Sequence, residues 1–232
     1  MNSVYLIPTL LSPDSKDAVL PAEVIDRVKN LDVFFVENLK TARRFISALK
    51  IGKVIDDITF HILTKDSEFE ETFNLMATLT EDVGILSEAG CPGIADPGAL
   101  AVEIGHQLNY NVVPLVGPSS ILLALMASGF NGQSFAFNGY LPIDNKERAK
   151  RIKELERLSH TSGQTQLFME TPYRNRQLFQ AILATCNPST KLTISANLTA
   201  PDAFSKTKSV GKWKEYKDID IHKKPAIFGF GS

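Results

Sequence analysis

The chain has 232 residues, which is enough to bury a substantial core in one large domain or two small ones. Its hydrophobic content of 44% and charged content of 22% exclude a globally disordered protein. The two cysteines, Cys91 and Cys186, and the four histidines are scattered without ligand spacing, so neither a disulfide framework nor a metal is implied.

The chain begins with "MNSVYLIPTLLSPD", which has no basic region and too short an apolar stretch for a signal peptide. The longest nearly apolar run, residues 112–130, approaches the length of a membrane span. Pro114, Gly117 and Pro118 interrupt it, which favours a buried strand, a tight loop and a helix. We therefore expect a cytoplasmic protein without a membrane partner.

The first half alternates between apolar runs of strand length and amphipathic segments of helix length. This order is typical of a mostly parallel sheet that helices cover on both faces. Strands are predicted at 3–9, 33–38, 58–64, 83–90 and 111–117, and helices at 21–30, 40–50, 67–81 and 100–108.

The alternation weakens after Gly117, and the pattern there predicts a second α/β domain with a mixed sheet. We place the domains at residues 1–116 and 117–232 and expect the ligand in the cleft between them. Helices are predicted at 118–129, 145–160 and 175–186, and sheet segments at 134–142, 164–171, 191–199, 210–216 and 225–232.

The overall charge of −1 conceals an asymmetry between the two halves. Residues 1–117 hold nine Lys and Arg against 17 Asp and Glu, a net charge of −8, whereas the rest holds 16 against nine, a net charge of +7. A basic half indicates an anionic partner, of which nucleic acid is the commonest large one. Helices with solvated Lys and Arg faces would produce the same count.

Four loops rich in Gly, Pro, Ser or Thr follow predicted strands: "IPTLLSPD", "SEAGCPGIADPG", "VGPSS" and "METPYRN". Open α/β sheets bind ligands at such positions, although each loop alone could be a plain connection. The dinucleotide, P-loop and nucleophile-elbow motifs are absent from the chain. Cys91 has no adjacent His or Lys to activate it. Glu170 and Arg174 could orient a substrate or form a structural ion pair, and Asp96 could cap the helix that follows it.

The set of motifs "SEAGCPGIADPGALAV", "VVPLVGPSSILLALMASG", "FAFNGYLP" and "FMETPYR" resembles the tetrapyrrole methylase superfamily of S-adenosylmethionine-dependent methyltransferases. Within it, the order and spacing are most similar to the ribosomal RNA small subunit methyltransferase I group over nearly the whole chain. The resemblance implies two α/β domains, a homodimer, and S-adenosylmethionine in the interdomain cleft.

The chemistry of methyl transfer and the resemblance together indicate roles for individual residues. Glu170 and Glu37 are candidate bases for activating an acceptor hydroxyl. Asp96, Arg174, Arg43 and Lys65 are expected to shape the site or meet the substrate, Lys65 through a phosphate. The expected cofactor contacts are Gly90, Cys91, Pro92, Ile94, Ser119, Ser120, Met169, Ala196, Asn197 and Ala226.

Three departures from the group's pattern bear on the substrate. The N-terminal loop reads "PTLLSPD" in place of P-T-P-I-G-N-L, "ENLK" stands in place of E-D-T-R, and Glu88 replaces an aspartate. The first two loops face the substrate in the family. The leading hypothesis is methylation of a ribose 2′-hydroxyl of small-subunit ribosomal RNA. The alternatives are a methyltransferase acting on a tetrapyrrole or another small molecule, and a non-catalytic protein that binds RNA or the cofactor.

Overall fold

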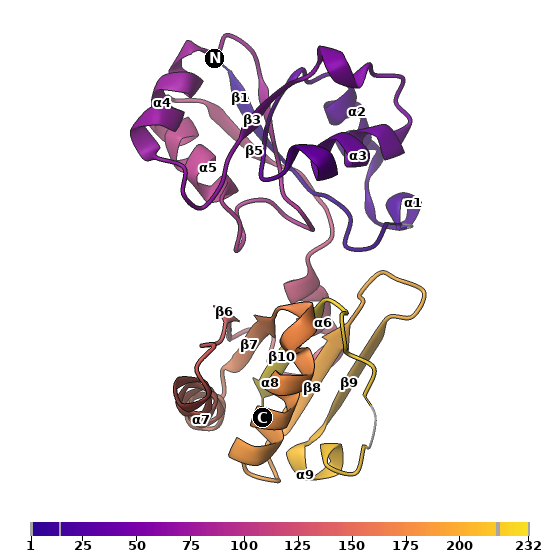
Figure 1. Cartoon of the computed structure of the whole chain (residues 1–232), viewed down its shortest axis with the longest axis vertical. Coiled ribbons are helices and arrows are strands. Elements are labelled where there is room, and N and C mark those ends of the chain that lie inside the picture. Colours follow the sequence, from indigo (N-terminus) through magenta and orange to yellow (C-terminus); the bar gives the residue numbers. More distant parts are fainter. Residues whose placement is uncertain (1, 14, 217–218, 232) are drawn as a thin grey trace. The chain divides into compact units, whose positions relative to one another are not determined.

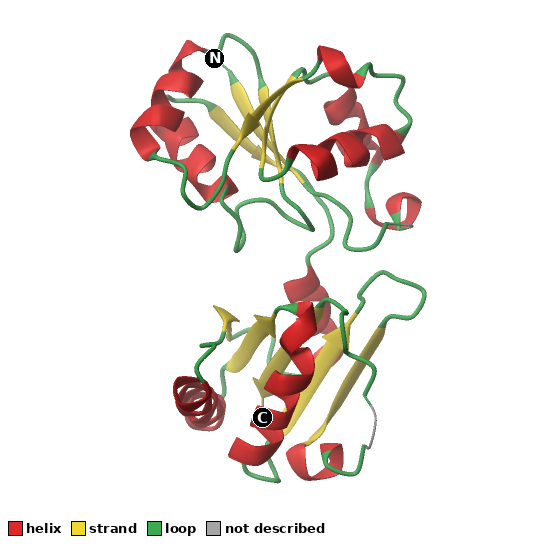
Figure 2. Cartoon of the chain, in the orientation of Figure 1, coloured by secondary structure: helices red, strands yellow, loops and turns green. Residues whose placement is uncertain are grey.

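The computed structural model describes residues 2–13, 15–216 and 219–231. Asp14 and Ser232, which belong to predicted segments, lie outside the described residues. Contacts divide the chain into two compact units, Met1–Ser119 and Ser120–Ser232, and each is described by itself (Figures 1 and 2). Among the described helices, none combines the length and the hydropathy that a membrane-spanning segment needs.

The first unit is built on a sheet of five parallel strands in the order β3-β2-β4-β1-β5. This confirms the predicted parallel sheet. Its elements are β1 (Ser3–Ile7), α1 (Lys16–Val19), α2 (Ala22–Lys29), β2 (Val33–Val36), α3 (Leu39–Leu49), η1 (Ile55–Asp57), β3 (Thr59–Ile62), α4 (Phe69–Thr78), β4 (Val83–Leu86), α5 (Gly98–Gln107) and β5 (Asn111–Pro114).

Helices cover both faces of this sheet, so its central strands are apolar throughout. In β2, Phe34 and Val36 pack toward α2 and α3, while Val33 and Phe35 pack toward α4 and α5 (Figure 1). This explains why the run "VFFV" shows no alternation with polar residues. Gly84 in β4 is the narrow point, because a Cβ atom there would lie 2.7 Å from side-chain carbons of both Ile7 and Phe34.

The second unit has a mixed five-stranded sheet in the order β6-β7-β10-β8-β9, as predicted. Among the described strands, β6 and β7 run parallel, and the other pairs are antiparallel. Its elements are α6 (Ser120–Ser128), β6 (Phe135–Tyr140), α7 (Asn145–Ser162), β7 (Thr165–Glu170), η2 (Pro172–Arg174), α8 (Asn175–Thr185), β8 (Lys191–Ala196), β9 (Phe204–Ser209), α9 (Val210–Trp213) and β10 (Ala226–Gly231).

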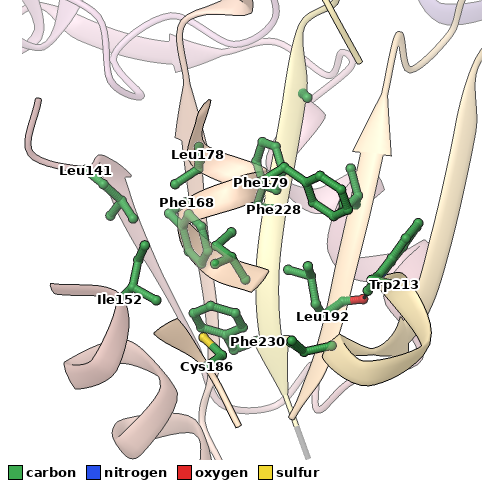
Figure 3. Close-up of a cluster of buried hydrophobic side chains, with 14 of the residues drawn as sticks. Leu141, Ile152, Phe168, Leu178, Phe179, Cys186, Leu192, Trp213, Phe228 and Phe230 are labelled. Carbon is green, nitrogen blue, oxygen red and sulfur yellow. Dashed lines mark hydrogen bonds between the residues drawn. The ribbon is translucent and has the colours of Figure 1, made fainter. Parts of the chain in front are cut away.

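The main core of this unit lies between the sheet and the helices α7, α8 and α9 (Figure 3). Phe168, Phe228 and Trp213 are fully buried in it, and the indole N–H of Trp213 donates to the Leu192 carbonyl at 2.9 Å. A smaller cluster on the opposite face holds α6 against Leu167 and Ile227. The alternation of Leu167 and Phe168 between the two clusters places a layer of helix on each side of the sheet.

One prediction for this unit is wrong. The segment 210–216 was expected to contribute to the sheet, but it begins with the short helix α9. The edge strand is instead the polar stretch just before it, β9, which pairs with β8 along its whole length. Capping explains the change, since the Ser209 side chain accepts from the Lys212 backbone N–H and starts the helix.

Candidate functional site

Three loops meet at the carboxyl edge of the parallel sheet, after β1, β4 and β5. The Thr9 N–H donates to the Gly90 carbonyl at 2.9 Å, and Gly90 has a φ of +78°. A Cβ atom on Gly90 would lie 3.1 Å from the Pro118 carbonyl oxygen and 3.2 Å from Leu11 Cδ2. Glycine is therefore required here both for its left-handed conformation and for the close approach of the loops.

Asp96 organises the loop between β4 and α5. Its Oδ1 accepts from the Gly93 N–H at 2.8 Å and from the Gly98 N–H at 2.7 Å, at the first residue of α5. The predicted capping contact is therefore present, and it also shapes the preceding turn. At the tip of the loop, the Ile94 side chain is 51% exposed, and Ala95 has a φ of +58°. The loop thus presents apolar atoms and main-chain groups to solvent.

Cys91 lies inside this arrangement as a protonated thiol. Its Sγ is 3.4 Å from the Pro118 carbonyl and 3.9 Å from that of Gly117. Burial raises the pKa of the thiol above its ordinary value. A nucleophilic cysteine needs a lowered pKa, so this environment favours a packing and donor role.

Glu37, which follows β2, lies between two other carboxylates. Burial, a hydrogen bond with Asp96 and the negative charges of Asp96 and Glu88 raise the pKa of Glu37 from 4.5 to about 7. Asp96 Oδ2 is buried and has no other hydrogen-bond donor among the described residues. Because the pKa of Glu37 is about 7 and its side chain is hydrogen-bonded to Asp96, the two carboxyl groups share one proton near neutral pH.

The same carboxyl pair lines a groove of about 470 Å³ in the first unit. The groove brings together three residues that the sequence predicts as site residues, namely Glu37, Lys65 and Asp96. Thr64, which was not predicted as a site residue, also lines it, and its only signal in the sequence is its place at the end of the predicted strand 58–64. Arg43 is engaged elsewhere, since its guanidinium pairs with Asp56.

In the second unit, four predicted residues lie in neighbouring register positions at one end of the sheet. Ala226 in β10 stands opposite Glu170 in β7 and opposite Ala196 in β8, and Ile227 stands opposite Met169. Asn197 follows directly, with a φ of +50° and with its side-chain amide donating to Asp202 at 3.0 Å.

Glu170 forms a buried ion pair with Arg174. Its Oε1 accepts from Arg174 Nη2 at 2.7 Å, from Arg174 Nε at 3.0 Å and from the Thr171 N–H at 2.7 Å. The carboxylate side chain is completely buried, and its Oε2 has no partner within the described parts of the chain. The geometry matches the structural ion pair that the sequence left open, and a catalytic role for Glu170 stays a prediction.

The predicted cofactor positions share one chemical property. None of the ten carries a charge, and most have a short or apolar side chain. Ser119 closes the first unit and Ser120 opens helix α6. Such a set suits a ligand that main-chain groups hold and apolar atoms cover, as the planar base and zwitterionic tail of S-adenosylmethionine require. Among residues 2–13, 15–216 and 219–231, no group of acidic, His or Cys side chains is placed to hold a metal.

Comparisons with known proteins identify distant relatives over most of the chain. The ribosomal RNA small subunit methyltransferase I of Bacillus subtilis is 30% identical over 182 residues, which are 78% of this chain and 59% of that protein. The protein of the same name from Vibrio cholerae is 27% identical over 198 residues, 84% and 65% of the two chains. The protein of the same name from Escherichia coli O157:H7 is 25% identical over 200 residues, which are 85% of this chain and 66% of that protein. The chain thus spans 59 to 66% of the length of these relatives.

The fold has a counterpart among solved structures. The crystal structure of the methyltransferase CobJ matches with a TM-score of 0.63 and 15% sequence identity, over 100% of this chain and 95% of that one. No family model matches the chain. The relatives and the shared fold agree with the motif pattern, and the chain belongs to the tetrapyrrole methylase superfamily as a divergent member similar to the ribosomal RNA small subunit methyltransferase I proteins.

Proposed function

We propose that this protein is an S-adenosylmethionine-dependent methyltransferase whose acceptor is a ribose 2′-hydroxyl of small-subunit ribosomal RNA. The observation that carries the proposal is the 30% identity over 78% of the chain with a ribosomal RNA small subunit methyltransferase I. The loops that contact one another at the carboxyl edge of the parallel sheet support it, because open α/β sheets bind their ligands there. The net charge of +7 after residue 117 supports an RNA acceptor.

The residues that would hold the cofactor are the uncharged positions described above, from the loop at Gly90 to Ala226. When bound, S-adenosylmethionine supplies a methyl group on a positively charged sulfur, which is already activated for displacement. The protein therefore contributes mainly by aligning the acceptor oxygen. Main-chain groups of the crowded loop at Gly90 would orient the donor, and Lys65 would bind a phosphate of the acceptor.

We assign Glu37 as the base that accepts the proton of the ribose hydroxyl. A ribose hydroxyl is a weak nucleophile, so a base at the site accelerates the reaction. A carboxylate with a pKa of about 7 takes up a proton more readily than an ordinary glutamate does. Asp96 then stabilises the protonated form by accepting its hydrogen bond. Glu170, held by Arg174, would position the second unit's loop.

Transfer of a tritiated methyl group tests the proposal. The purified protein is incubated with labelled S-adenosylmethionine and either free small-subunit RNA, assembled subunits or a tetrapyrrole. We expect label in RNA, in ribose after digestion, and a strong loss with Glu37→Gln but not with the exposed Glu23→Gln. Label in the tetrapyrrole alone would overturn the RNA acceptor. Salt-dependent RNA binding without any transfer would identify a non-catalytic relative.

The proposal includes a homodimer, which the family resemblance implies, and two domains divided near residue 116. Sedimentation of the purified chain tests the first. For the second, limited proteolysis should cut between residues 112 and 120 and release two fragments.

A further inference from the structure

A second hollow in the first unit is separate from the groove at Glu37. It is a half-enclosed pocket of about 320 Å³ at the carboxyl ends of β1, β2 and β4, bounded on its outer side by α3. Its walls come from the loop after β1, from one face of α3 and from the start of the loop after β4. The walls use the residues Leu10, Leu11, Phe45, Ala48, Arg44 and Glu88.

The walls of this pocket are mostly apolar. Leu10 and Leu11 line one side, and Phe45 and Ala48 of α3 line another. The residues of α3 that line it are at positions 41, 42, 44, 45 and 48, and four of these five, 41, 44, 45 and 48, have the spacing of a single helix face. An apolar face with one aromatic ring is suited to a flat ring system, which gains from both burial and stacking.

Two charged side chains stand at the pocket and supply opposite hydrogen-bonding functions. Arg44 is exposed and makes no ion pair or side-chain hydrogen bond within the described part of the chain, whereas its neighbour Arg43 is paired with Asp56. The Glu88 carboxylate accepts from the Thr41 hydroxyl, which fixes one of its oxygens. The pocket therefore offers a ligand the hydrogen-bond donors of the Arg44 guanidinium and, in the Glu88 carboxylate, an acceptor that Thr41 holds in place.

We propose that this pocket receives one nucleobase of the acceptor RNA, unstacked from its neighbours, with Glu88 and Arg44 reading its polar edge. The inference rests on the proposed function. Enzymes that modify a nucleobase hold the unstacked base between aromatic or apolar side chains and bind its polar edge by hydrogen bonds, and this pocket offers the same two kinds of contact. Carboxylates accept from exocyclic amino groups, and guanidinium groups donate to ring acceptors.

The volume of the pocket suits a small group. Ligand pockets range from about 300 to 1,000 Å³, and about 320 Å³ places this pocket at the small end of that range, as a single nucleobase requires. One of the two loops that depart from the family's pattern lines the pocket, since Leu10 and Leu11 belong to "PTLLSPD", and Thr41 directly follows the other, "ENLK". These departures would then set which base is accepted.

The test is a titration of the full chain with the four ribonucleoside 5′-monophosphates, in which NMR shifts of the backbone amides report binding. Ribose 5-phosphate is the probe without a base. We expect at least one nucleotide to shift amides of the pocket and to bind at least about tenfold more tightly than ribose 5-phosphate. Equal binding of ribose 5-phosphate would overturn the proposal, as would shifts confined to other parts of the chain.

Two variants with matched controls locate the binding. Ala48→Trp fills the pocket from its exposed rim and should weaken nucleotide binding about tenfold or more, whereas Ala77→Trp on the exposed face of α4 should not. Arg44→Gln should reduce the preference among bases about fivefold or more, and Lys29→Gln, the same charge change on α2, should leave it unchanged. Unchanged binding in Ala48→Trp would contradict the inference.

Cofactor binding separates this inference from the proposed function. All four variants should bind S-adenosylmethionine as the unchanged chain does. If nucleotides bind in the pocket but no methyl group is transferred, the proposed function fails and the base site stands. If RNA is methylated by Ala48→Trp with an unchanged KM, the base site fails and the proposed function stands.

Discussion

The carboxyl groups of Glu37 and Asp96 share a hydrogen bond at the carboxyl edge of the parallel sheet. The two residues follow β2 and β4, which are neighbours in the sheet although α3, η1, β3 and α4 separate these strands along the chain. Glu88 adds a third negative charge nearby. Two carboxylates this close cannot both ionise freely, so the pair holds a proton near neutral pH.

The shared proton makes the folded state's stability depend on pH. The pKa of Glu37 in the folded chain, about 7, lies above its ordinary value of 4.5. Its stabilising contribution is therefore complete below pH 4.5 and is lost as the pH rises to about 7. We expect Glu37→Gln to keep its uncharged hydrogen bond and to lower this slope, measured as Tm against pH. Glu23→Gln should keep the slope of the unchanged chain. A steeper slope in Glu37→Gln would be inconsistent with the shared proton.

The rate of methyl transfer should follow the same ionisation in the opposite direction. A base must be unprotonated to accept the acceptor's proton, so kcat should rise with pH and level off above about 7. Glu37→Gln should reduce kcat by about 10² to 10⁴ and abolish this step. If kcat of the variant is lower but still rises with pH and levels off above about 7, another group is the base.

The ion pair of Glu170 and Arg174 should be important for the stability of the second unit. Arg174→Ala leaves a completely buried carboxylate without its partner, which destabilises a protein by about 3 kcal/mol. Chemical denaturation measures this loss, and Glu170→Gln added to Arg174→Ala should recover part of it. Glu154→Gln, which breaks an exposed pair on α7, should have little effect. Equal effects of Arg174→Ala and Glu154→Gln would show that the buried pair is not structural.

Cys91→Ser should leave methyl transfer within a few-fold of the unchanged chain. Serine keeps a donor close to the Pro118 carbonyl, and the raised pKa of the thiol argues against a thiolate nucleophile. Alkylation at pH 7.5 should be slow for the same reason. Complete loss of transfer in Cys91→Ser, with cofactor binding intact, would assign Cys91 a covalent role.

The parallel and mixed sheets could be predicted because their central strands are short apolar runs such as "VFFV" and "AIFGF". The strand β9 could not, since "FSKTKS" alternates lysine with small polar residues and becomes a strand only by pairing with β8. Its lysines suit an edge strand, where charge prevents pairing with other chains.

The predicted site was less complete than the predicted fold, for a topological reason. The sequence indicates loops at strand ends, but it does not indicate that β2 and β4 are neighbours. The contact of Glu37 with Asp96 could therefore not be predicted. The position of each arginine around the axis of α3 determines what its side chain contacts. Arg43 points to Asp56, and Arg44, one position further, lies at the pocket. A hundred degrees of helical rotation separates a structural pair from a candidate ligand contact.

Isothermal titration of the purified chain with S-adenosylmethionine is the decisive test of whether the loop at Gly90 binds the cofactor. The account predicts micromolar binding that Gly90→Val abolishes, because a side chain there is strained at a φ of +78° and meets the Pro118 carbonyl. Gly132→Ala, which places a methyl group in open space, should bind as the unchanged chain does. Absence of binding by the unchanged chain, or equal binding by Gly90→Val, would contradict the account.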